Sequence, residues 1–183
     1  MKKFEEKTIH TEKIYEGKVI NLQVDEVTLP NGKTSKRELI KHPGAVAIIP
    51  ITKGNKIVFV EQYRKPLEKS LVEIPAGKLE PGEQPEVTAI RELEEETGYT
   101  TDADSLEFVA SFYTSPGFAD EIMHLYLTKD IVPLENKRSG DDDEFVELIE
   151  LTLEEAKDYV NEQRIHDAKT NYAILYLEML ERM

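Results

Sequence analysis

Residues 77–99 read GKLEPGEQPEVTAIRELEEETGY, a loop rich in glycine and proline followed by a charged helix that ends at Gly98. Residues three and four positions apart lie on the same face of a helix. Glu92, Glu95 and Glu96 are therefore expected to converge, whereas Glu94 points elsewhere. The stretch predicts three clustered carboxylates on one helical face.

Clustered carboxylates of this kind have two explanations. The glutamates repel one another by about 0.2–0.5 kcal/mol per exposed pair. A divalent cation would remove this repulsion, because Mg²⁺ prefers oxygen ligands and usually keeps bound water. The alternative is a solvated acidic helix, since runs of like charge usually face solvent.

The spacing of the whole stretch resembles the box of the Nudix hydrolases, G-x5-E-x7-R-E-U-x-E-E-x-G-U, in which U is a bulky apolar residue. The matching positions are Gly77, Glu83, Arg91, Glu92, Leu93, Glu95, Glu96, Gly98 and Tyr99. Tyr99 departs from the usual aliphatic residue in the last position. The match over 23 residues favours a metal-binding helix over a solvated one.

The composition is typical of a soluble globular protein. The chain has 183 residues, enough for one well-buried domain with a small appendage, and 39% of them are hydrophobic. The longest apolar run, residues 45–51, is far too short to span a bilayer. The start, MKKFEEK, has no apolar region of a signal peptide. Because the chain has no cysteine, we expect no disulfides and a cytoplasmic location.

The net charge of -14 bears on the partners of the chain. A field of this sign disfavours binding to nucleic acids and to anionic membranes, so we expect neither partner. It also repels phosphorylated small molecules. A phosphate substrate would therefore require local cations or a few placed arginines.

The chain is expected to divide into two parts at His42-Pro43-Gly44. Residues 1–42 form a β-rich segment, with a hairpin turn at residues 30–33 and a return strand over residues 34–41. Residues 43–183 form the larger domain.

The larger domain alternates predicted strands and helices. Thr152 and Glu155 form a capping box that opens a helix, and Asp167 caps the last helix. The apolar stripe of that helix is expected to pack into the core; it comprises Tyr172, Leu175, Tyr176, Met179 and Leu180. Strands are predicted at residues 45–51, 57–63, 71–75, 107–113, 121–127 and 145–151.

This order of elements indicates an α+β protein. The resemblance implies the Nudix fold, a mixed β-sheet sandwiched between helices (an α/β/α sandwich). It also implies a role for each box residue. Glu92, Glu96 and the backbone carbonyl of Ala76 would bind the metal, with Glu95 close by as a catalytic group. Structural roles in the loop and helix fall to Gly77, Glu83, Arg91 and Gly98.

Segments outside the box resemble the bacterial ADP-ribose pyrophosphatase branch of the family. They are EQYR (61–64), EIPAG (73–77), Ser115-Pro116-Gly117, GDDDEFVE (140–147) and DAKT (167–170). The resemblance implies Mg²⁺-dependent hydrolysis of ADP-ribose to AMP and ribose 5-phosphate, with Mn²⁺ as a possible substitute. Arg64 and residues 115–117 would bind the substrate.

The same branch uses a glutamate on a loop outside the box as general base or as a further metal ligand. The matching residue is Glu144. A solvated acidic loop is the alternative, and neighbouring acids could take the role instead: Asp141, Asp142, Asp143 and Glu147.

The resemblance also implies a homodimer that exchanges N-terminal segments. Glu38 matches a residue that contacts adenine from the partner subunit. Some relatives stack adenine between tryptophans, but this chain has none. Arg37, tyrosine or phenylalanine would have to replace them.

Three functions stay open at this point. One is hydrolysis of ADP-ribose, and a second is hydrolysis of other nucleotide sugars or of nucleoside triphosphates. The third is a non-catalytic module that binds ADP-ribose. The complete box and the acidic charge disfavour the third function.

Overall fold

The structure is a computed structural model that describes residues 3–129, 131–135 and 145–183. The chain forms two compact units. The first contains residues 1–44 and 112–122, and the second contains residues 45–111 and 123–183.

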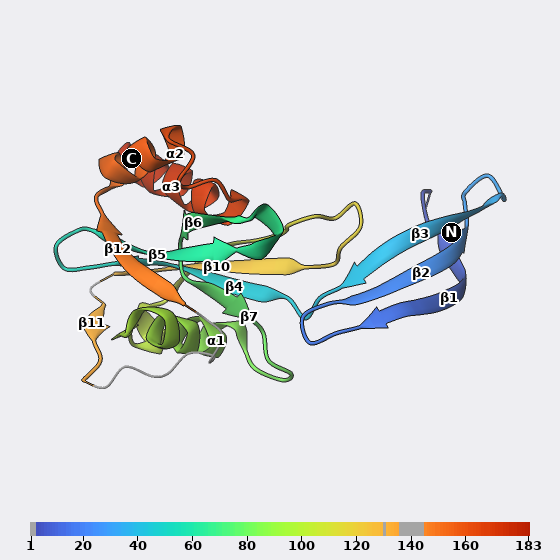
Figure 1. Cartoon of the computed structure of the whole chain (residues 1–183), viewed down its shortest axis with the longest axis horizontal. Helices are drawn as coiled ribbons and strands as arrows, with labels where there is room; N and C mark the ends of the chain where they lie inside the picture. Colours follow the sequence, from blue (N-terminus) through green and yellow to red (C-terminus); the bar gives the residue numbers. More distant parts are fainter. Residues whose placement is uncertain (1–2, 130, 136–144) are drawn as a thin grey trace. The chain divides into compact units, whose positions relative to one another are not determined.

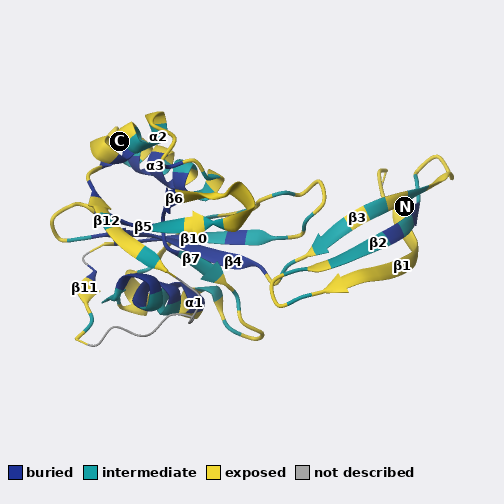
Figure 2. Ribbon diagram, viewed as in Figure 1, coloured by how far each residue is buried: buried dark blue, intermediate teal, exposed yellow. Residues whose placement is uncertain are grey.

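The first unit contains a three-stranded antiparallel sheet of β1 (Lys7–Glu16), β2 (Asn21–Thr28) and β3 (Thr34–Lys41). The predicted hairpin turn is present between β2 and β3. There Gly32 has a φ of +83°, and the Asn31 side chain accepts a hydrogen bond from the Lys33 N–H at 3.0 Å. Strand β1 is exposed along its whole length (Figure 2).

A buried carboxylate joins β1 to β2. Asp25 is 7% exposed, and its oxygens accept hydrogen bonds from the Thr11 hydroxyl at 2.8 Å and the Gln23 amide at 2.9 Å. The Thr8 hydroxyl donates a third at 3.2 Å. These bonds offset the cost of burying the charge.

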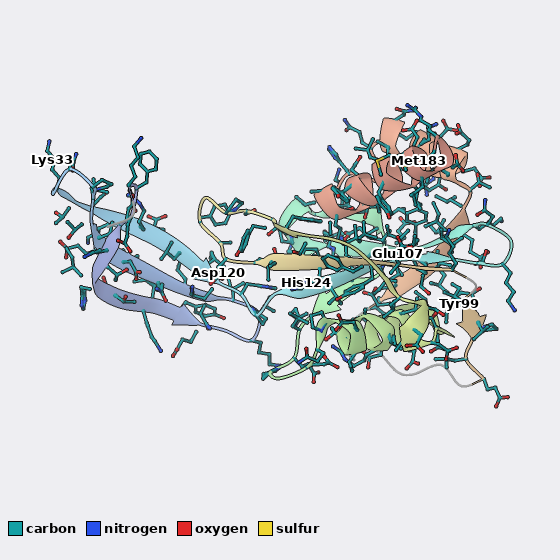
Figure 3. All side chains as sticks on the ribbon, turned by 180° about the vertical axis from the view of Figure 1, so that it is seen from behind. Lys33, Tyr99, Glu107, Asp120, His124 and Met183 are labelled. Carbon is teal, nitrogen blue, oxygen red and sulfur yellow. The ribbon has the colours of Figure 1, made fainter. Side chains whose placement is uncertain are left out.

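The first unit also takes in residues 112–122, which the predicted division assigned to the larger domain. The physical reason is pairing with the end of β3. The Ile40 N–H donates to the Phe118 carbonyl at 2.7 Å, and the Asp120 N–H donates to the Ile40 carbonyl at 3.2 Å. Asp120, labelled in Figure 3, also forms an ion pair with Lys41.

The second unit is built on a mixed sheet with the strand order β12-β5-β4-β10-β9, in which β6 pairs with β5 and β7 with β4. Strand β4 lies parallel to β10 and antiparallel to β5. All seven residues of β4 are buried, as their continuous apolar sequence predicts (Figure 2). The strands are β4 (Ala45–Ile51), β5 (Ile57–Arg64), β6 (Lys69–Glu73), β7 (Ala76–Lys78), β9 (Glu107–Tyr113), β10 (Ile122–Lys129) and β12 (Val146–Leu151).

Helices cover both faces of this sheet (Figure 1). Helix α1 (Pro85–Glu92) lies on one face, and α2 (Leu153–Asn161) and α3 (Ala168–Glu181) lie on the other. The predicted α+β class and the sandwich of a mixed sheet between helices are confirmed. Shorter elements are η1 (Lys65–Leu67), η3 (Ala103–Ser105) and the pair β8 (Tyr99–Thr100) and β11 (Val132–Pro133).

Both predicted helix caps are present. The Thr152 hydroxyl accepts from the Glu155 N–H at 3.3 Å, and the Glu155 carboxylate accepts from the Thr152 N–H at 2.8 Å. Asp167 Oδ1 accepts from the Thr170 N–H at 3.1 Å. These bonds satisfy N–H groups that a helix terminus leaves without intrahelical partners.

The predicted core stripe of α3 was wrong for three of its five residues, whereas Tyr176 and Leu180 are partly buried. Tyr172, Leu175 and Met179 are 42%, 65% and 49% exposed, whereas the buried side chains are Thr170, Ala173, Ile174 and Leu177. Apolar residues occupy both faces of this helix, so their spacing alone did not select the buried one. Within the described ranges, no helix is both long and apolar enough to cross a membrane.

Candidate active site

The box of residues 77–99 runs from β7 through a loop into α1 and then into a π-helical turn, η2 (Leu93–Thr97). Pro85 starts α1, a position where its missing N–H costs nothing. The turn ends at Gly98, whose φ of +71° places it in the left-handed region and whose N–H donates to the Glu94 carbonyl at 3.0 Å. The sequence predicted one continuous helix, whereas the acidic residues 94–96 lie in the wider π turn.

Apolar contacts fix this helix on the sheet. Ala89 packs with Val46, Ile48 and Tyr126, and Leu93 packs with Val58 and other buried residues. Tyr99, labelled in Figure 3, packs its ring against the second cluster and donates its hydroxyl to Glu150 at 2.9 Å. A tyrosine suits the last box position, because its ring packs against apolar side chains while its hydroxyl has a hydrogen-bond partner.

Two box glutamates lie against the start of the box. The Ala76 N–H donates to Glu96 Oε2 at 3.0 Å. A Cβ atom on Gly77 would lie only 1.9 Å from Cδ of Glu92, so glycine is required for this approach. Glu92 and Glu96 are 8% and 4% exposed. The structure thus brings together Ala76, Gly77, Glu92 and Glu96.

Arg91 links the other box carboxylates. Its Nη1 donates to Glu92 Oε1 at 2.8 Å and to Glu95 Oε2 at 2.9 Å. Its Nε and Nη2 donate to the two oxygens of Glu83 at 3.3 and 3.2 Å, so Arg91 and Glu83 form an ion pair between the helix and the loop before it. The Thr88 hydroxyl completes this cluster with a bond to Glu83 Oε2 at 2.7 Å.

These contacts shift the pKa values of both partners. Burial lowers the pKa of Arg91, but the hydrogen bond to Glu83 and the charge of Glu92 outweigh it and raise that pKa. The hydrogen bond from Arg91 lowers the pKa of Glu83 below its ordinary value of 4.5. Arg91 is therefore a fixed cation, and Glu83 is a fixed anion near neutral pH.

The same contacts decide how the cluster could hold a metal. Within the described residues, no group of three or more His, Cys, Asp and Glu side chains is arranged to hold a metal ion. Arg91 lies between Glu92 and Glu95, and Glu96 turns to the Ala76 N–H. The donors still suit a hard dication, because the carboxylates of Glu92 and Glu96 lie against Gly77 and Ala76, and oxygen is the ligand that such an ion prefers.

Glu94 points away from this cluster, as predicted. It is 9% exposed and accepts a hydrogen bond from the Thr100 hydroxyl at 2.6 Å. This bond connects Glu94 to β8.

Arg64 lies at the end of β5 and pairs with a residue that the sequence did not single out. Its Nε and Nη2 donate to the two oxygens of Glu73 at 2.7 and 2.8 Å. Lys169 also bonds to Glu73. The EIPAG and DAKT segments contain these two residues, but the sequence offered no signal that they meet.

The other predicted substrate residues lie in the first unit. Arg37 and Glu38 are neighbours in β3, so their side chains point to opposite faces of the sheet. Arg37 is bound to Glu6 through two hydrogen bonds of 2.8 and 2.6 Å.

Ser115 opens a turn in which its carbonyl accepts from the N–H groups of Phe118 and Ala119 at 3.1 and 2.9 Å. Pro116 and Gly117 lie within this turn. Glu144 lies outside the described residues.

Comparison with known proteins identifies the class. A model of the NUDIX domain matches residues 41–171, and a model of the nucleoside diphosphate sugar hydrolase N-terminal domain matches residues 6–40. The chain belongs to the Nudix hydrolase family. Enzymes of this family generally need a divalent metal.

Two relatives match the chain over its full length. It is 64% identical over 182 residues to the methanol dehydrogenase activator of Bacillus methanolicus. This match covers 97% of the length of that activator. It is 59% identical over 183 residues to the ADP-ribose pyrophosphatase of Bacillus subtilis (strain 168), covering 98% of it.

A solved structure supports the fold. The crystal structure of an ADP compounds hydrolase superposes with a TM-score of 0.84 over 97% of this chain and 95% of that chain. Its sequence identity is 19%, so the likeness concerns the fold.

Proposed function

We propose that this chain hydrolyses the pyrophosphate bond of ADP-ribose and releases AMP and ribose 5-phosphate. The observation that carries the proposal is the full-length match, at 59% identity, to a protein named ADP-ribose pyrophosphatase. The arrangement of the box residues supports the same reaction, because a pyrophosphate needs its charge offset where water attacks.

In this proposal Glu92, Glu96 and the Ala76 carbonyl would hold Mg²⁺, with Mn²⁺ as a possible substitute. The ion would supply the positive charge that the acidic chain lacks at this site. Arg91 keeps Glu92 and Glu95 from repelling each other. Glu95 lies on the same turn as Glu96 and is proposed as a catalytic group.

Glu144 is proposed as the base that takes a proton from the attacking water, or as a further metal ligand. Arg64 is proposed to bind a substrate phosphate, because a guanidinium forks onto phosphate oxygens. Residues 115–117 and Glu38 are proposed to bind the remainder of the substrate. Arg37 is the weaker candidate of the set, because Glu6 occupies its guanidinium.

The test is release of AMP by purified wild-type and variant protein in Mg²⁺. Glu96→Gln should lower turnover by at least about 10³-fold, since it removes a charge from the reacting centre. Glu86→Gln is the matched control, because Glu86 is an exposed glutamate in the first turn of α1. Full activity of Glu96→Gln would contradict the proposal.

A substrate panel separates the alternative substrates. ADP-ribose, GDP-mannose, a nucleoside triphosphate and a dinucleoside polyphosphate are compared by kcat/KM under the same conditions. We expect ADP-ribose to give the highest value. Binding of ADP-ribose without turnover in Mg²⁺ or Mn²⁺ would instead indicate a non-catalytic module.

A second candidate function rests on the relative that is 64% identical, which is named for activating methanol dehydrogenase. We propose that this chain can also activate such a dehydrogenase. The assay adds wild-type or Glu96→Gln protein to the dehydrogenase. Activation by wild type alone would connect it to hydrolysis, whereas equal activation by both would indicate a binding effect.

We also propose that the active form is a homodimer that exchanges N-terminal segments. The exposed strand β1 supports this proposal, because unpaired strand edges and exposed apolar side chains favour association. A cytoplasmic location is proposed from the cysteine-free composition.

A further inference from the structure

The start of α3 is joined to the segment that precedes the box (Figure 1). The Ile74 N–H donates to the buried Thr170 hydroxyl at 3.1 Å. Three residues before Asp167, the cap of α3, the chain also bonds to β6, where the Val72 N–H donates to the Arg164 carbonyl at 2.9 Å. Neither of these two bonds, which dock this end of the helix, is an ion pair.

Between these two bonds lies Glu73, a carboxylate that is 2% exposed. Arg64 holds both of its oxygens through Nε and Nη2, and Lys169 binds Oε2. Lys169 also donates to Asp167 Oδ1 at 3.0 Å. The side chains of Lys169 and Arg64 are 11% and 38% exposed, so the lysine is the inner cation and the arginine the outer one.

The geometry fixes which edge of the arginine remains available. Nε and one side of Nη2 face Glu73, and among the described residues no acceptor bonds to Nη1. A guanidinium has five N–H donors in a rigid plane. Holding one edge therefore aims the other edge, which includes Nη1, in a defined direction.

The electrostatics agree with this geometry. The hydrogen bond to Glu73 raises the pKa of Arg64, and the charges of Glu73, Glu96 and Asp167 add to it. Glu73, which holds Arg64, lies four residues before Gly77, the first residue of the box. Burial alone would raise the pKa of Glu73, but the bonds from Arg64 and the charge of Lys169 lower it.

We propose that Lys169 is a positioning residue: by holding Oε2 of Glu73, it fixes the Arg64 guanidinium with its Nη1 edge directed to a phosphate group of the substrate. The inference rests on the proposed function, because the phosphate belongs to the pyrophosphate substrate. It assigns to Lys169, on α3, a role in substrate binding that is exerted through Glu73 and Arg64 and not by contact with the substrate.

The competing explanation is that Lys169 only stabilises the attachment of α3. A buried ion pair is weak evidence for stability, because desolvation of both charges offsets their attraction. The Thr170 hydroxyl and the Arg164 carbonyl already attach this end of the helix to residues 72–74. The two explanations differ in whether the loss of Lys169 changes Arg64 or only the melting temperature.

The first experiment is a kinetic cycle with Lys169→Met, Glu73→Gln and the double variant. Each single variant should raise KM for ADP-ribose about tenfold, with kcat changed less than about twofold, as for one lost charge-assisted contact. The double variant should have the same KM as Glu73→Gln within about twofold, because Lys169 acts through Glu73. It removes the charges of Glu73 and Lys169 together, and Asp167 keeps its bond from the Thr170 N–H. Thermal unfolding checks that its fold is preserved.

Lys157→Met is the matched control, because Lys157 also lies on a C-terminal helix and pairs with Glu154 at 2.9 Å. It should leave KM unchanged. Two results would overturn the inference. One is a KM for ADP-ribose that Lys169→Met leaves unchanged. The other is a rise in KM from Lys169→Met that is equally large with and without Glu73→Gln.

The second experiment needs no turnover. NMR of the Arg64 Nε–H in the substrate-free protein should give a slowly exchanging signal in wild type and in Lys157→Met. Lys169→Met should increase its hydrogen-exchange rate at least about tenfold, and Lys169→Arg should restore part of the protection. If the wild-type protein does not hydrolyse ADP-ribose, the proposed function is rejected. If Lys169→Met leaves the exchange rate of the Arg64 Nε–H unchanged, the positioning role of Lys169 is rejected.

Discussion

Gly77 occupies a place where one added carbon atom would displace a carboxylate. The atoms that a Cβ would meet belong to the end of the Glu92 side chain, at 1.9–2.3 Å. Because a flexible side chain can move, the substitution should change the position of Glu92 more than the stability of the fold.

We therefore expect Gly77→Ala to lower turnover on the order of 10²-fold, as for a misplacement of about 1 Å at a reacting centre. The free energy of unfolding should fall by only about 1 kcal/mol. The measurements are AMP release and urea unfolding, and Gly54→Ala is the control because its Cβ would make ordinary contact only. Unfolding of Gly77→Ala together with loss of activity would contradict this account.

Glu83 gives a second prediction at the scale of one residue. Its pKa is lowered in the folded state by the hydrogen bond from Arg91, so its contribution to stability is present above about pH 4.5 and is lost as the pH falls through the folded-state pKa. The free energy of unfolding of wild type should therefore fall more steeply below pH 4.5 than that of Glu83→Gln. Urea unfolding at pH 7, 5, 4 and 3.5 measures both slopes; parallel slopes would contradict the shift.

At the scale of elements, α3 shows what sequence periodicity can and cannot determine. Its apolar side chains cover more than one face, so spacing predicted a helix but selected the wrong side. Leu177 is 7% exposed and Leu175 is 65% exposed. The two leucines therefore form a matched pair of positions on one helix.

Leu177→Ala should lower the free energy of unfolding by about 3 kcal/mol, because it leaves a cavity in the core. Leu175→Ala should change it by less than about 0.5 kcal/mol. Thermal and urea unfolding of the two variants give the comparison. Equal losses would show that Leu175 is also buried in solution.

Local signals predicted most elements of the fold. The buried strand 45–51, the turn at Asn31-Gly32 and the caps at Thr152 and Asp167 each depend on residues close in the sequence. The family match supplied the arrangement of the sheet and helices, which those local signals do not contain.

The site was predictable only in part. The box residues lie within 23 positions, so their spacing was visible. The bond between Glu73 and Lys169 joins residues 96 positions apart, and the π-helical turn depends on how the box packs on the sheet. Neither leaves a periodic pattern in the sequence.

At the scale of the whole molecule, the proposed homodimer is the main prediction. Sedimentation equilibrium should give about twice the chain mass of 21.0 kDa. Replacing Ile9 and Ile14, which are 55% and 50% exposed on β1, with lysine should shift the protein to monomer and lower its activity. Val87→Lys on α1 is the control, at 55% exposure. A wild-type monomer with full activity would reject the dimer.

The polypeptide passes between the two units three times, at residues 44/45, 111/112 and 122/123. The N-terminal sheet is thus not a detachable module, although a separate family model ends at residue 40. A deletion at that point would remove the Ile40 groups that pair with Phe118 and Asp120. Residues 1–44 and 112–122 form one unit. A chimaera that takes its N-terminal region from a relative should therefore also take residues 112–122 from that relative.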